Sequence, residues 1–381
     1  MRICLITSCF PPSPGGIERC VFELSTRLKR RGHETTIITS SRGLPIGTYN
    51  QIWDHVGHVI RYPEQFTAFE VPVAPEISAR LLFDSDYDVL HIHGMTPGQS
   101  DLSLVASKLS KAKIVYTHHF DPQTYGGHLT KLYSYVGRCT IGLADVITAS
   151  TSSYARSSQF LKPYLSRVRI VPMGVDSARF DSQSSTANSQ IYDLAPALAS
   201  FQKKILYVGK LIYYKGIDNL LYAFSELRGT DACLMIVGEG VEKRHLTQLA
   251  KQLHVSDRVF FLGTVPDPQL PSTYSAADVV VLPSITRREA FGIVILEAMA
   301  SGKPVVASAI PGVSEVVRHG MTGYLVPPGN PTALASALES ILLDQARAKR
   351  MGGEARRLAA NQYDWERIYE QYVTLYERGV S

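Results

Sequence analysis

Short apolar runs rich in β-branched residues alternate along the chain with longer amphipathic stretches. Such runs predict buried parallel strands, and the stretches between them predict helices that cover the sheet. Two successive series of strands result. The first comprises Arg2–Ser8, Thr35–Thr39, Asp88–His93, Lys113–Thr117, Asp145–Ala149 and Val168–Pro172, and the second comprises Lys204–Gly209, Ala232–Gly238, Arg258–Gly263, Asp278–Pro283, Pro304–Ser308 and Tyr324–Val326.

A polar segment without hydrophobic periodicity separates the two series. Residues 181–190 read Asp-Ser-Gln-Ser-Ser-Thr-Ala-Asn-Ser-Gln, which is typical of a linker or surface loop. The chain has 381 residues, more than one hydrophobic core usually holds. We therefore predict two Rossmann-like α/β domains, at 1–180 and 181–360, and a C-terminal helix within 361–381. Ligands of such sheets bind beyond the carboxyl ends of the strands.

The composition is that of an ordinary globular protein, with 45% hydrophobic and 19% charged residues. The five cysteines are odd in number and lack metal-ligand spacing, which indicates reduced thiols. The first apolar run is too short for a signal peptide, and no later run reaches the roughly 18 residues of a membrane-spanning helix. We expect a cytoplasmic protein.

Positive charge is concentrated in the first predicted domain. Residues 1–180 contain 19 Lys and Arg against 14 Asp and Glu, and the remainder contains 20 of each. An anionic partner is therefore expected on that domain. The helix predicted from Ile17 to Arg31 has a basic end that could rest on acidic lipid headgroups, although cations there also complement the helix dipole. No motif for reading nucleic acid accompanies this charge.

Two glutamates eight positions apart, Glu289 and Glu297, frame the predicted start of a helix. A helix start presents unpaired amide groups and a partial positive charge, which suit phosphate oxygens. One carboxylate before the helix and another two turns along it suit the hydroxyls of a sugar nucleotide. The residues that lead into the helix and supply its first amides are Phe291, Gly292, Ile293 and Val294.

Glycines and lysines follow the first strand of each series. Gly15 and Gly16 come after the first strand of the chain, where paired glycines let backbone amides approach an anion. Lys210 and Lys215 follow the first strand of the second series. Two cations at the end of a strand would neutralise a diphosphate leaving group.

Histidines cluster at two predicted strand ends. His91 and His93 end one strand, and His118 and His119 follow its neighbour. A lone histidine is more often structural than catalytic, but several at the carboxyl ends of adjacent strands are candidates for a site.

These pieces, in this order, resemble glycosyltransferase family 4 of the GT-B fold, which includes phosphatidylinositol mannosyltransferases, sucrose synthases and bacterial glycogen synthases. The resemblance covers nearly the whole chain. Its most specific part is the pair of glutamates with the intervening Phe-Gly and the following Ala-Met-Ala-Ser-Gly. The other parts are Pro-Pro-x-x-Gly15-Gly16, Asp88-Val-Leu-His-Ile-His93, Thr117-x-His119, Gly209-Lys210 with Lys215-Gly216, and Pro304-Val-Val-Ala-Ser308.

The resemblance implies two Rossmann-like domains facing each other across a deep cleft, with the C-terminal helix within 361–381 crossing back to the N-terminal domain. It also implies roles for named residues. Gly16, Lys210 and Lys215 would contact the donor phosphates. Glu297 would bind the ribose and Glu289 the hydroxyls of the transferred sugar. His119 matches the family's catalytic histidine, near the C6 side of that sugar. Position 210 is usually arginine in the family, so lysine supplies a point charge there in place of a planar fork.

No cofactor or metal is expected. The acids Asp84 and Asp86 flank Ser85 and mimic the Asp-x-Asp metal motif of the other large glycosyltransferase fold. They precede a buried strand, at the edge of the sheet opposite the ligand edge, and turn formation accounts for them. We assign no metal to them.

The implied activity is retaining transfer of a hexose from a nucleoside diphosphate sugar, UDP-linked before GDP-linked, to a lipid-linked, glycolipid or polysaccharide hydroxyl. Peripheral contact with an anionic membrane and a part in glycan or cell-envelope synthesis would follow. Four alternatives stay open. These are a non-hydrolysing UDP-sugar epimerase of the same fold, a pyridoxal-phosphate-dependent glycan phosphorylase, an inactive binding subunit, and a transferase with a soluble acceptor, such as a sucrose or glucan synthase.

Overall fold

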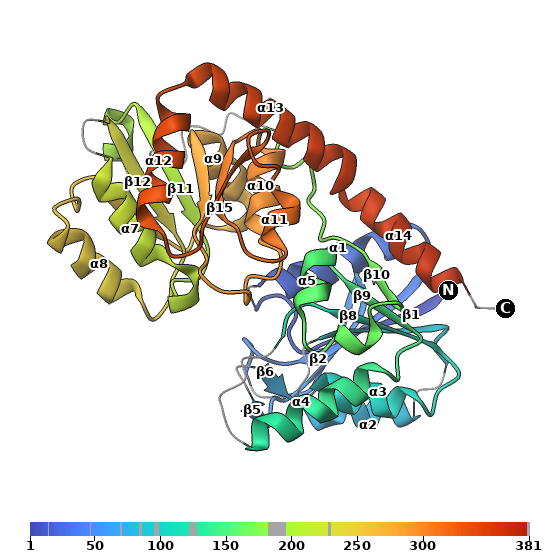
Figure 1. The fold of residues 1–381 in the computed structure, drawn as a ribbon. Coiled ribbons are helices and arrows are strands. Elements are labelled where there is room, and N and C mark those ends of the chain that lie inside the picture. Colours follow the sequence, from blue (N-terminus) through green and yellow to red (C-terminus); the bar gives the residue numbers. More distant parts are fainter. Residues whose placement is uncertain are drawn as a thin grey trace. The chain divides into compact units, whose positions relative to one another are not determined.

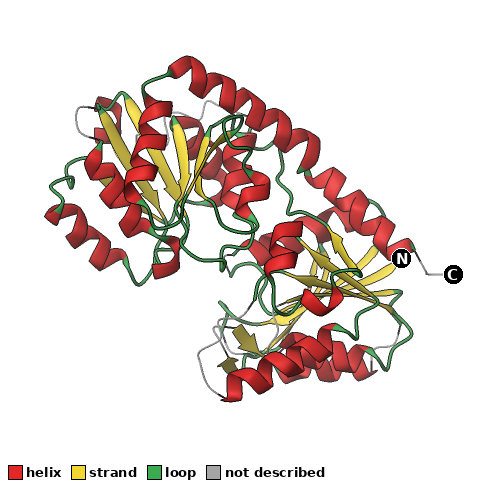
Figure 2. Ribbon diagram, in the orientation of Figure 1, coloured by secondary structure: helices red, strands yellow, loops and turns green. Residues whose placement is uncertain are grey.

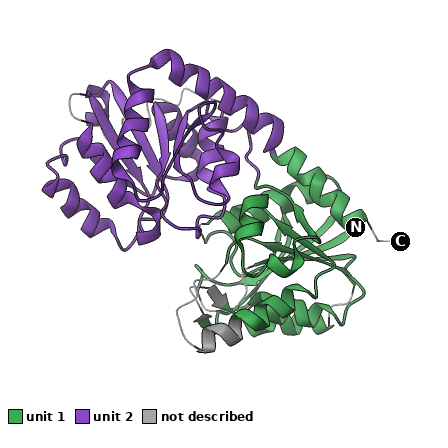
Figure 3. Ribbon diagram, viewed as in Figure 1, with its two compact units in different colours: residues 1–173, 365–381 green, residues 174–364 purple. Residues whose placement is uncertain are grey.

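The computed structural model describes residues 1–378 except 14, 46, 69–70, 84–85, 95–98, 122–127, 182–195 and 228–229. The chain forms two compact units (Figure 3). Unit 1 comprises Met1–Met173 and Trp365–Ser381, and unit 2 comprises Gly174–Asp364. The divisions therefore fall at 173 and 364, where the sequence predicted 180 and 360. Except for Asp181, the predicted linker 181–190 lies outside the described residues.

Unit 1 is built on an eight-stranded sheet in the order β10-β9-β8-β7-β1-β2-β4-β3. All neighbouring strands are parallel except β3 and β4, which form an antiparallel pair. The six strands predicted for the first series are present, and the sequence analysis missed β3 and β4. The strands are β1 (Arg2–Thr7), β2 (Glu34–Ser40), β3 (Tyr49–Trp53), β4 (Gly57–Tyr62), β7 (Val89–Gly94), β8 (Lys113–His118), β9 (Val146–Ala149) and β10 (Val168–Ile170), with a separate ribbon of β5 (Phe66–Ala68) and β6 (Val71–Val73).

Helices cover both faces of this sheet. One face carries α2 (Pro75–Phe83), α3 (Gln99–Ser107) and α4 (His128–Ile141), which lie side by side (Figure 1). Their apolar residues pack on alternate strand positions such as Leu90 and Ile92. The other positions, including His91, face α14 (Trp365–Glu377), which packs against α1 (Gly16–Arg30). A shorter helix, α5 (Ser152–Ser157), follows β9.

The C-terminal helix α14 is anchored to the basic end of α1. Trp365 is buried, and the Arg27 guanidinium lies over its ring at 5.7 Å. Both Arg27 and Arg31 pair with Glu366, at 3.2 and 3.0 Å. Arg27 and Arg31, which belong to the basic helix end predicted to contact lipid headgroups, are thus paired with α14.

Unit 2 contains a six-stranded, fully parallel sheet in the order β13-β12-β11-β14-β15-β16. All six correspond to strands predicted for the second series. They are β11 (Lys203–Val208), β12 (Ala232–Val237), β13 (Val259–Gly263), β14 (Val279–Leu282), β15 (Val305–Ser308) and β16 (Gly323–Val326). Each strand is followed by helical structure, which is why neighbouring strands can run parallel.

Helices cover both faces of this sheet too (Figure 2). The core on one face is formed with α7 (Ile217–Glu226), α8 (Lys243–Gln252) and α12 (Pro331–Leu342). The other face carries α9 (Leu270–Ala276), α10 (Ile293–Ala300) and α13 (Gln345–Gln362), and α11 (Val313–Val316) follows β15 (Figure 1). Two doubly wound units of this kind confirm the predicted fold class. Within the described residues, no helix is both long enough and apolar enough to cross a bilayer.

Candidate active site

The centre of the unit 2 sheet is where the order of its strands reverses. The first strand, β11, pairs with the fourth, β14, so the chain winds outward in both directions from this pair. Such a switch point leaves a crevice at the carboxyl ends of the two strands, where ligands of doubly wound sheets bind. The loop after β11 carries Lys210 and Lys215, and the loop after β14 carries Glu289.

Lys215 and Glu289 meet at this edge in a direct ion pair. The Lys215 Nζ lies 2.5 Å from Glu289 Oε2, and the side chains are only 15% and 11% exposed. Ser284 Oγ donates to the same carboxylate oxygen at 3.0 Å. Burial alone would lower the pKa of Lys215, but the charge of Glu289, the nearby Tyr214 and the hydrogen bond to Glu289 hold it above its ordinary value. Lys215 is therefore a permanent cation at neutral pH.

Glycines allow the two loops to approach so closely. Gly216 adopts φ +65°, and a Cβ there would lie 2.3 Å from the carbonyl oxygen of Pro283. Gly312, at φ +93°, lies just as close to the backbone of Ala290, since its Cβ would stand 2.0 Å from that carbonyl oxygen. The loop from Pro283 to Ala290 is therefore held between backbone contacts that only glycine permits.

The start of α10 has the geometry that the sequence predicted. Gly292 is its N-cap at φ +77°, and a Cβ there would meet Leu282 Cδ2 at 2.6 Å. Phe291 is buried and packs edge-on against Tyr363, with ring centroids 6.1 Å apart. A glycine cap has no side chain to satisfy the first helical amides, which belong to Ile293 and Val294.

Glu297 lies one turn inside α10 and is buried, with 5% of its surface exposed. Tyr274 of α9 donates its hydroxyl hydrogen to Glu297 Oε2 at 2.7 Å. A buried carboxylate needs such a donor, because desolvation of an unpaired charge is costly. Glu297 therefore belongs to the interior of unit 2, and Glu289 belongs to the loop with Lys215.

The side chain of Lys210 is exposed, and its backbone carbonyl accepts a hydrogen bond within the loop after β11. The Tyr207 hydroxyl donates to the carbonyl oxygen of Lys210 at 3.0 Å. This bond fixes the turn after β11. The Nζ of Lys210 carries no described ion pair, in contrast to that of Lys215.

In unit 1, the predicted glycines lie at the start of α1. Gly15 is the N-cap and Gly16 the first helical residue. Gly16 is exposed, and a Cβ there would meet no atom within 4 Å. Nothing in the packing therefore requires glycine at 16, and its predicted approach to phosphate stays a prediction.

The predicted histidine cluster forms on β7 and β8 of the same unit. His91 Nδ1 lies 2.6 Å from the Tyr376 hydroxyl, and His91 Nε2 lies 2.7 Å from Thr117 Oγ1. The imidazole of His93 lies between His91 and His119, with centroids 3.9 and 5.4 Å away. His118 is directed elsewhere, to Asp121 at 2.8 Å. His119 is thus buried in a histidine stack that α14 supports.

Sequence reasoning missed two polar residues of unit 2. Ser284 directly follows the predicted strand Asp278–Pro283, and this position at the ligand edge would have identified it as a candidate site residue. Tyr274 lies on a helix far from that edge in sequence, and no local pattern pairs it with Glu297. Of the two acids set aside as a turn, Asp84 lies outside the described residues, as does Ser85 between them, while Asp86 pairs with Arg2 at 3.2 Å.

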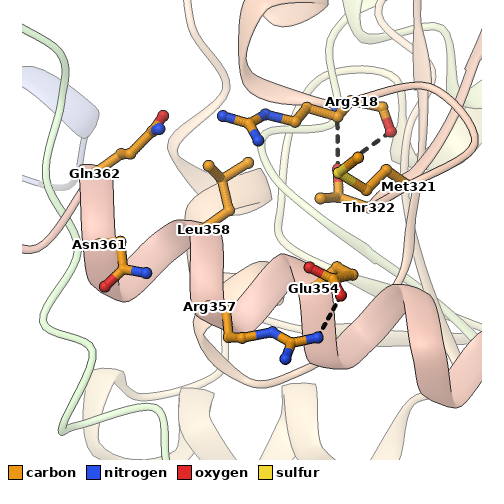
Figure 4. Close-up of a pocket in the computed structure, with 8 residues that line it drawn as sticks. All are labelled: Arg318, Met321, Thr322, Glu354, Arg357, Leu358, Asn361 and Gln362. Atoms are coloured by element: carbon orange, nitrogen blue, oxygen red, sulfur yellow. Dashed lines mark hydrogen bonds and ion pairs between the residues drawn. The ribbon is translucent and has the colours of Figure 1, made fainter.

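A cavity of about 230 Å³ lies elsewhere in unit 2 (Figure 4). It is bounded by the loop before β16 and the second half of α13. None of the predicted site residues lines it. Its lining comprises Arg318, Met321, Thr322, Glu354, Arg357, Leu358, Asn361 and Gln362.

Comparison with known proteins assigns the chain to a family. Residues 14–179 match the model of Glycosyltransferase Family 4, and residues 195–358 match that of Glycosyl transferases group 1. An N-acetyl-alpha-D-glucosaminyl L-malate synthase of Bacillus anthracis is 30% identical over 99% of this chain and 97% of its own length. A phosphatidyl-myo-inositol mannosyltransferase of Mycobacterium leprae is 30% identical over 99% and 96%.

The solved structures agree on the fold. A sucrose-phosphate synthase from Thermosynechococcus elongatus superposes with a TM-score of 0.81 and 25% identity, over 99% of this chain and 98% of the other. The two α/β units and this likeness identify the GT-B fold. The chain belongs to the group 1 glycosyltransferases of family 4. This membership confirms the resemblance and leaves the epimerase and phosphorylase alternatives without support.

The buried histidines make the stability of unit 1 depend on pH. Burial, with a smaller repulsion from His118, lowers the pKa of His119 to about 3. An unfolded histidine titrates near 6.5. Between these values the unfolded chain binds protons that the folded chain does not, so the free energy of unfolding falls as the pH drops below about 6.5, by at most about 1.4 kcal/mol per pH unit for one histidine.

The His119→Gln variant should therefore lose less stability than the unmodified protein between pH 6.5 and pH 5. Urea unfolding followed by tryptophan fluorescence measures this, because the only two tryptophans, Trp53 and Trp365, both belong to unit 1. His245→Gln, on the exposed side of α8 in unit 2, is the control. Equal pH slopes for His119→Gln and the unmodified protein would contradict the prediction.

Proposed function

We propose that the protein transfers a hexose, with retention of anomeric configuration, from a nucleoside diphosphate sugar to an anionic or lipid-linked acceptor. The main support for a sugar-nucleotide donor is the Lys215–Glu289 ion pair beside the start of α10. A cation and free helical amides suit a diphosphate, and the adjacent carboxylate suits sugar hydroxyls. This combination is what a sugar nucleotide presents at its reacting end.

The donor is UDP-linked before GDP-linked. Lysine charges and backbone amides bind a diphosphate whatever its base, so the base assignment rests on the resemblance found in the sequence. Glu297 binds the ribose in this proposal, and Glu289 binds the transferred sugar.

The proposed chemistry is attack on the same face from which the nucleotide departs. No Asp or Glu stands out as a covalent nucleophile, and Glu289 is engaged with Lys215. The departing β-phosphate oxygen accepts the proton of the acceptor hydroxyl. Lys210, Lys215 and the amides from Gly292 to Val294 stabilise the negative charge that develops on that phosphate. None of these steps requires a metal.

An anionic acceptor is supported by the charge of the N-terminal half and by the names of two relatives. One relative is named for L-malate, a soluble dicarboxylate, and the other for phosphatidyl-myo-inositol, a lipid. Both acceptors are anions, although only the second is held in a membrane.

The surface of α3 favours the lipid-linked acceptor. This helix buries polar side chains beside Leu104 and Ala106 and leaves other apolar side chains exposed. Gln99 and Ser103 are buried in hydrogen bonds to each other and to Ser78. The exposed side chains along its outer face and the turn after it are Leu102 (46%), Val105 (54%) and Leu109 (78%).

The charges around this helix suit an anionic bilayer. Segment 99–142 contains five Lys and Arg residues and two acids, Asp101 and Asp121, and both acids are buried. A second copy of the chain would bring these positive charges face to face. Exposed apolar side chains in a segment with a net positive charge are instead typical of surfaces that rest on anionic lipid.

Replacing Lys215 by alanine should weaken the binding of UDP or GDP by roughly 1.5–3 kcal/mol, the range for hydrogen bonds to charged groups. Titration calorimetry with each nucleotide measures this. Lys349→Ala, on the exposed side of α13 in the same unit, is the control. Unchanged affinity in a normally folded Lys215→Ala protein would remove this lysine from the donor site.

The two glutamates should differ in their kinetic signatures. Glu289→Gln should lower kcat with little change in donor KM, because the proposal has Glu289 hold the sugar chiefly in the transition state. Glu297→Gln should raise donor KM, because it weakens binding that ground and transition states share. Glu354→Gln, which removes a surface partner of Arg357, is the control.

Incubation with labelled UDP- and GDP-sugars, with and without acceptors, supplies the assay, and NMR of the product shows its anomeric configuration. An inverted product would refute retention. Equal kcat losses in both glutamate variants, at unaltered KM, would refute the division of roles.

Vesicle co-sedimentation tests the membrane-presented acceptor. At low salt the protein should bind anionic vesicles more strongly than neutral ones, because its cations lie beside an apolar surface. The double variant Leu102→Ser, Leu109→Ser should lose that binding, whereas Val241→Ser, which removes an exposed apolar side chain from unit 2, should keep it. Equal binding to neutral and anionic vesicles would point to a soluble acceptor.

A further inference from the structure

Two buried histidines on neighbouring strands share one hydrogen bond. His93, near the end of β7, places its Nδ1 3.2 Å from Nε2 of His119, which directly follows β8. Their rings are stacked at an interplanar angle of 23°, and they are 1% and 6% exposed. Burial lowers the pKa of both, and neighbouring imidazoles lower it further, so both rings are neutral at pH 7. A neutral imidazole carries one N–H, so one ring donates and the other accepts.

The second nitrogen of His93 decides which ring donates. His93 Nε2 is buried and has no hydrogen-bond partner among the residues that the structure describes. If His119 donated, the proton of His93 would sit on this Nε2 as a buried N–H group without an acceptor. If His93 donates from Nδ1, its Nε2 is only an unused lone pair. Buried donors without a partner are rarer in folded proteins than unused acceptors, so the second arrangement is favoured.

We infer that His93 is a positioning residue that donates to His119 and fixes it as the Nδ1–H tautomer. His119 Nε2 is then occupied as an acceptor, and its only donor is Nδ1–H. Within the described part of the chain, Nδ1 of His119 has no hydrogen-bond partner. A ligand group bonded to this N–H has to be an acceptor, such as the oxygen of a sugar hydroxyl.

The stack holds the orientation of both rings. His93 is confined between His91 and His119, and His91 is fixed at both nitrogens by Tyr376 and Thr117. The tautomer of His119 is thus set by contacts inside unit 1. Only the statement that His119 meets a substrate oxygen rests on the proposed function.

Long-range proton–nitrogen NMR spectra of histidine-labelled protein read the tautomer directly. His119, assigned by its loss in His119→Gln, should give the pattern of a ring protonated at Nδ1. His93→Leu should shift it toward a mixture with the Nε2–H form. His93→Asn, whose amide can donate from nearly the same place, should restore the Nδ1–H form. Tyr376→Phe, which removes a hydrogen bond from His91 in the same stack, should leave His119 unchanged.

A ring protonated at Nε2 in the unmodified protein would overturn the inference, as would an unchanged His119 tautomer in a folded His93→Leu protein. Transferase kinetics separate this result from the proposed function. His93→Leu should lower kcat on the order of tenfold at unchanged nucleotide affinity, since misplaced groups near the reacting atoms slow transfer strongly. The expected spectra with undiminished kcat would uphold the tautomer and count against a substrate contact by His119.

Discussion

The parallel pairing of β11 with β14 is the constraint on which the site of unit 2 depends. Parallel strands bring their carboxyl ends to one edge, and the reversal of strand order at this pair leaves both following loops free to turn inward. Lys215 and Glu289 are 74 positions apart in sequence, and this pairing makes them neighbours. Gly216 and Gly312 are then needed because no side chain fits where the loops meet. The chemistry of the site is thus a consequence of strand order.

Unit 1 has a different constraint, because it buries histidine side chains within the core beside its sheet. His91 is bonded at both ring nitrogens, and the neighbouring strand β8 supplies only one of the two partners, Thr117. The last helix supplies the missing hydroxyl through Tyr376, while Trp365 and Glu366 secure the other end of that helix against α1. A segment more than 280 residues away in sequence therefore completes the hydrogen bonding of His91.

Local sequence patterns were sufficient for the architecture. Every strand of the two predicted series is present, because buried parallel strands read as continuous apolar runs. The hairpin of β3 and β4 was missed, since Asn50 and Gln51 interrupt the apolar pattern and much of β3 is exposed. The buried face of α3 was not predictable from an apolar pattern, because the polar side chains Gln99 and Ser103 are buried there in hydrogen bonds to each other and to Ser78. The pairing of Tyr274 with Glu297 and the contact of His93 with His119 depend on tertiary placement, which no local period encodes.

The ion pair of Lys215 with Glu289 keeps two poorly exposed charges neutralised while no substrate is bound. Each partner alone would carry a costly desolvation penalty at its low exposure, and together they neutralise one another. A sugar nucleotide brings a diphosphate for the lysine and hydroxyls for the glutamate, so it can replace both halves of the pair at once. Inorganic phosphate would satisfy the lysine only and would leave the carboxylate facing an added negative charge. If the pair forms the donor site proposed above, it favours ligands that carry an anion and a polyol together, which is a specificity that two separate charges would not provide.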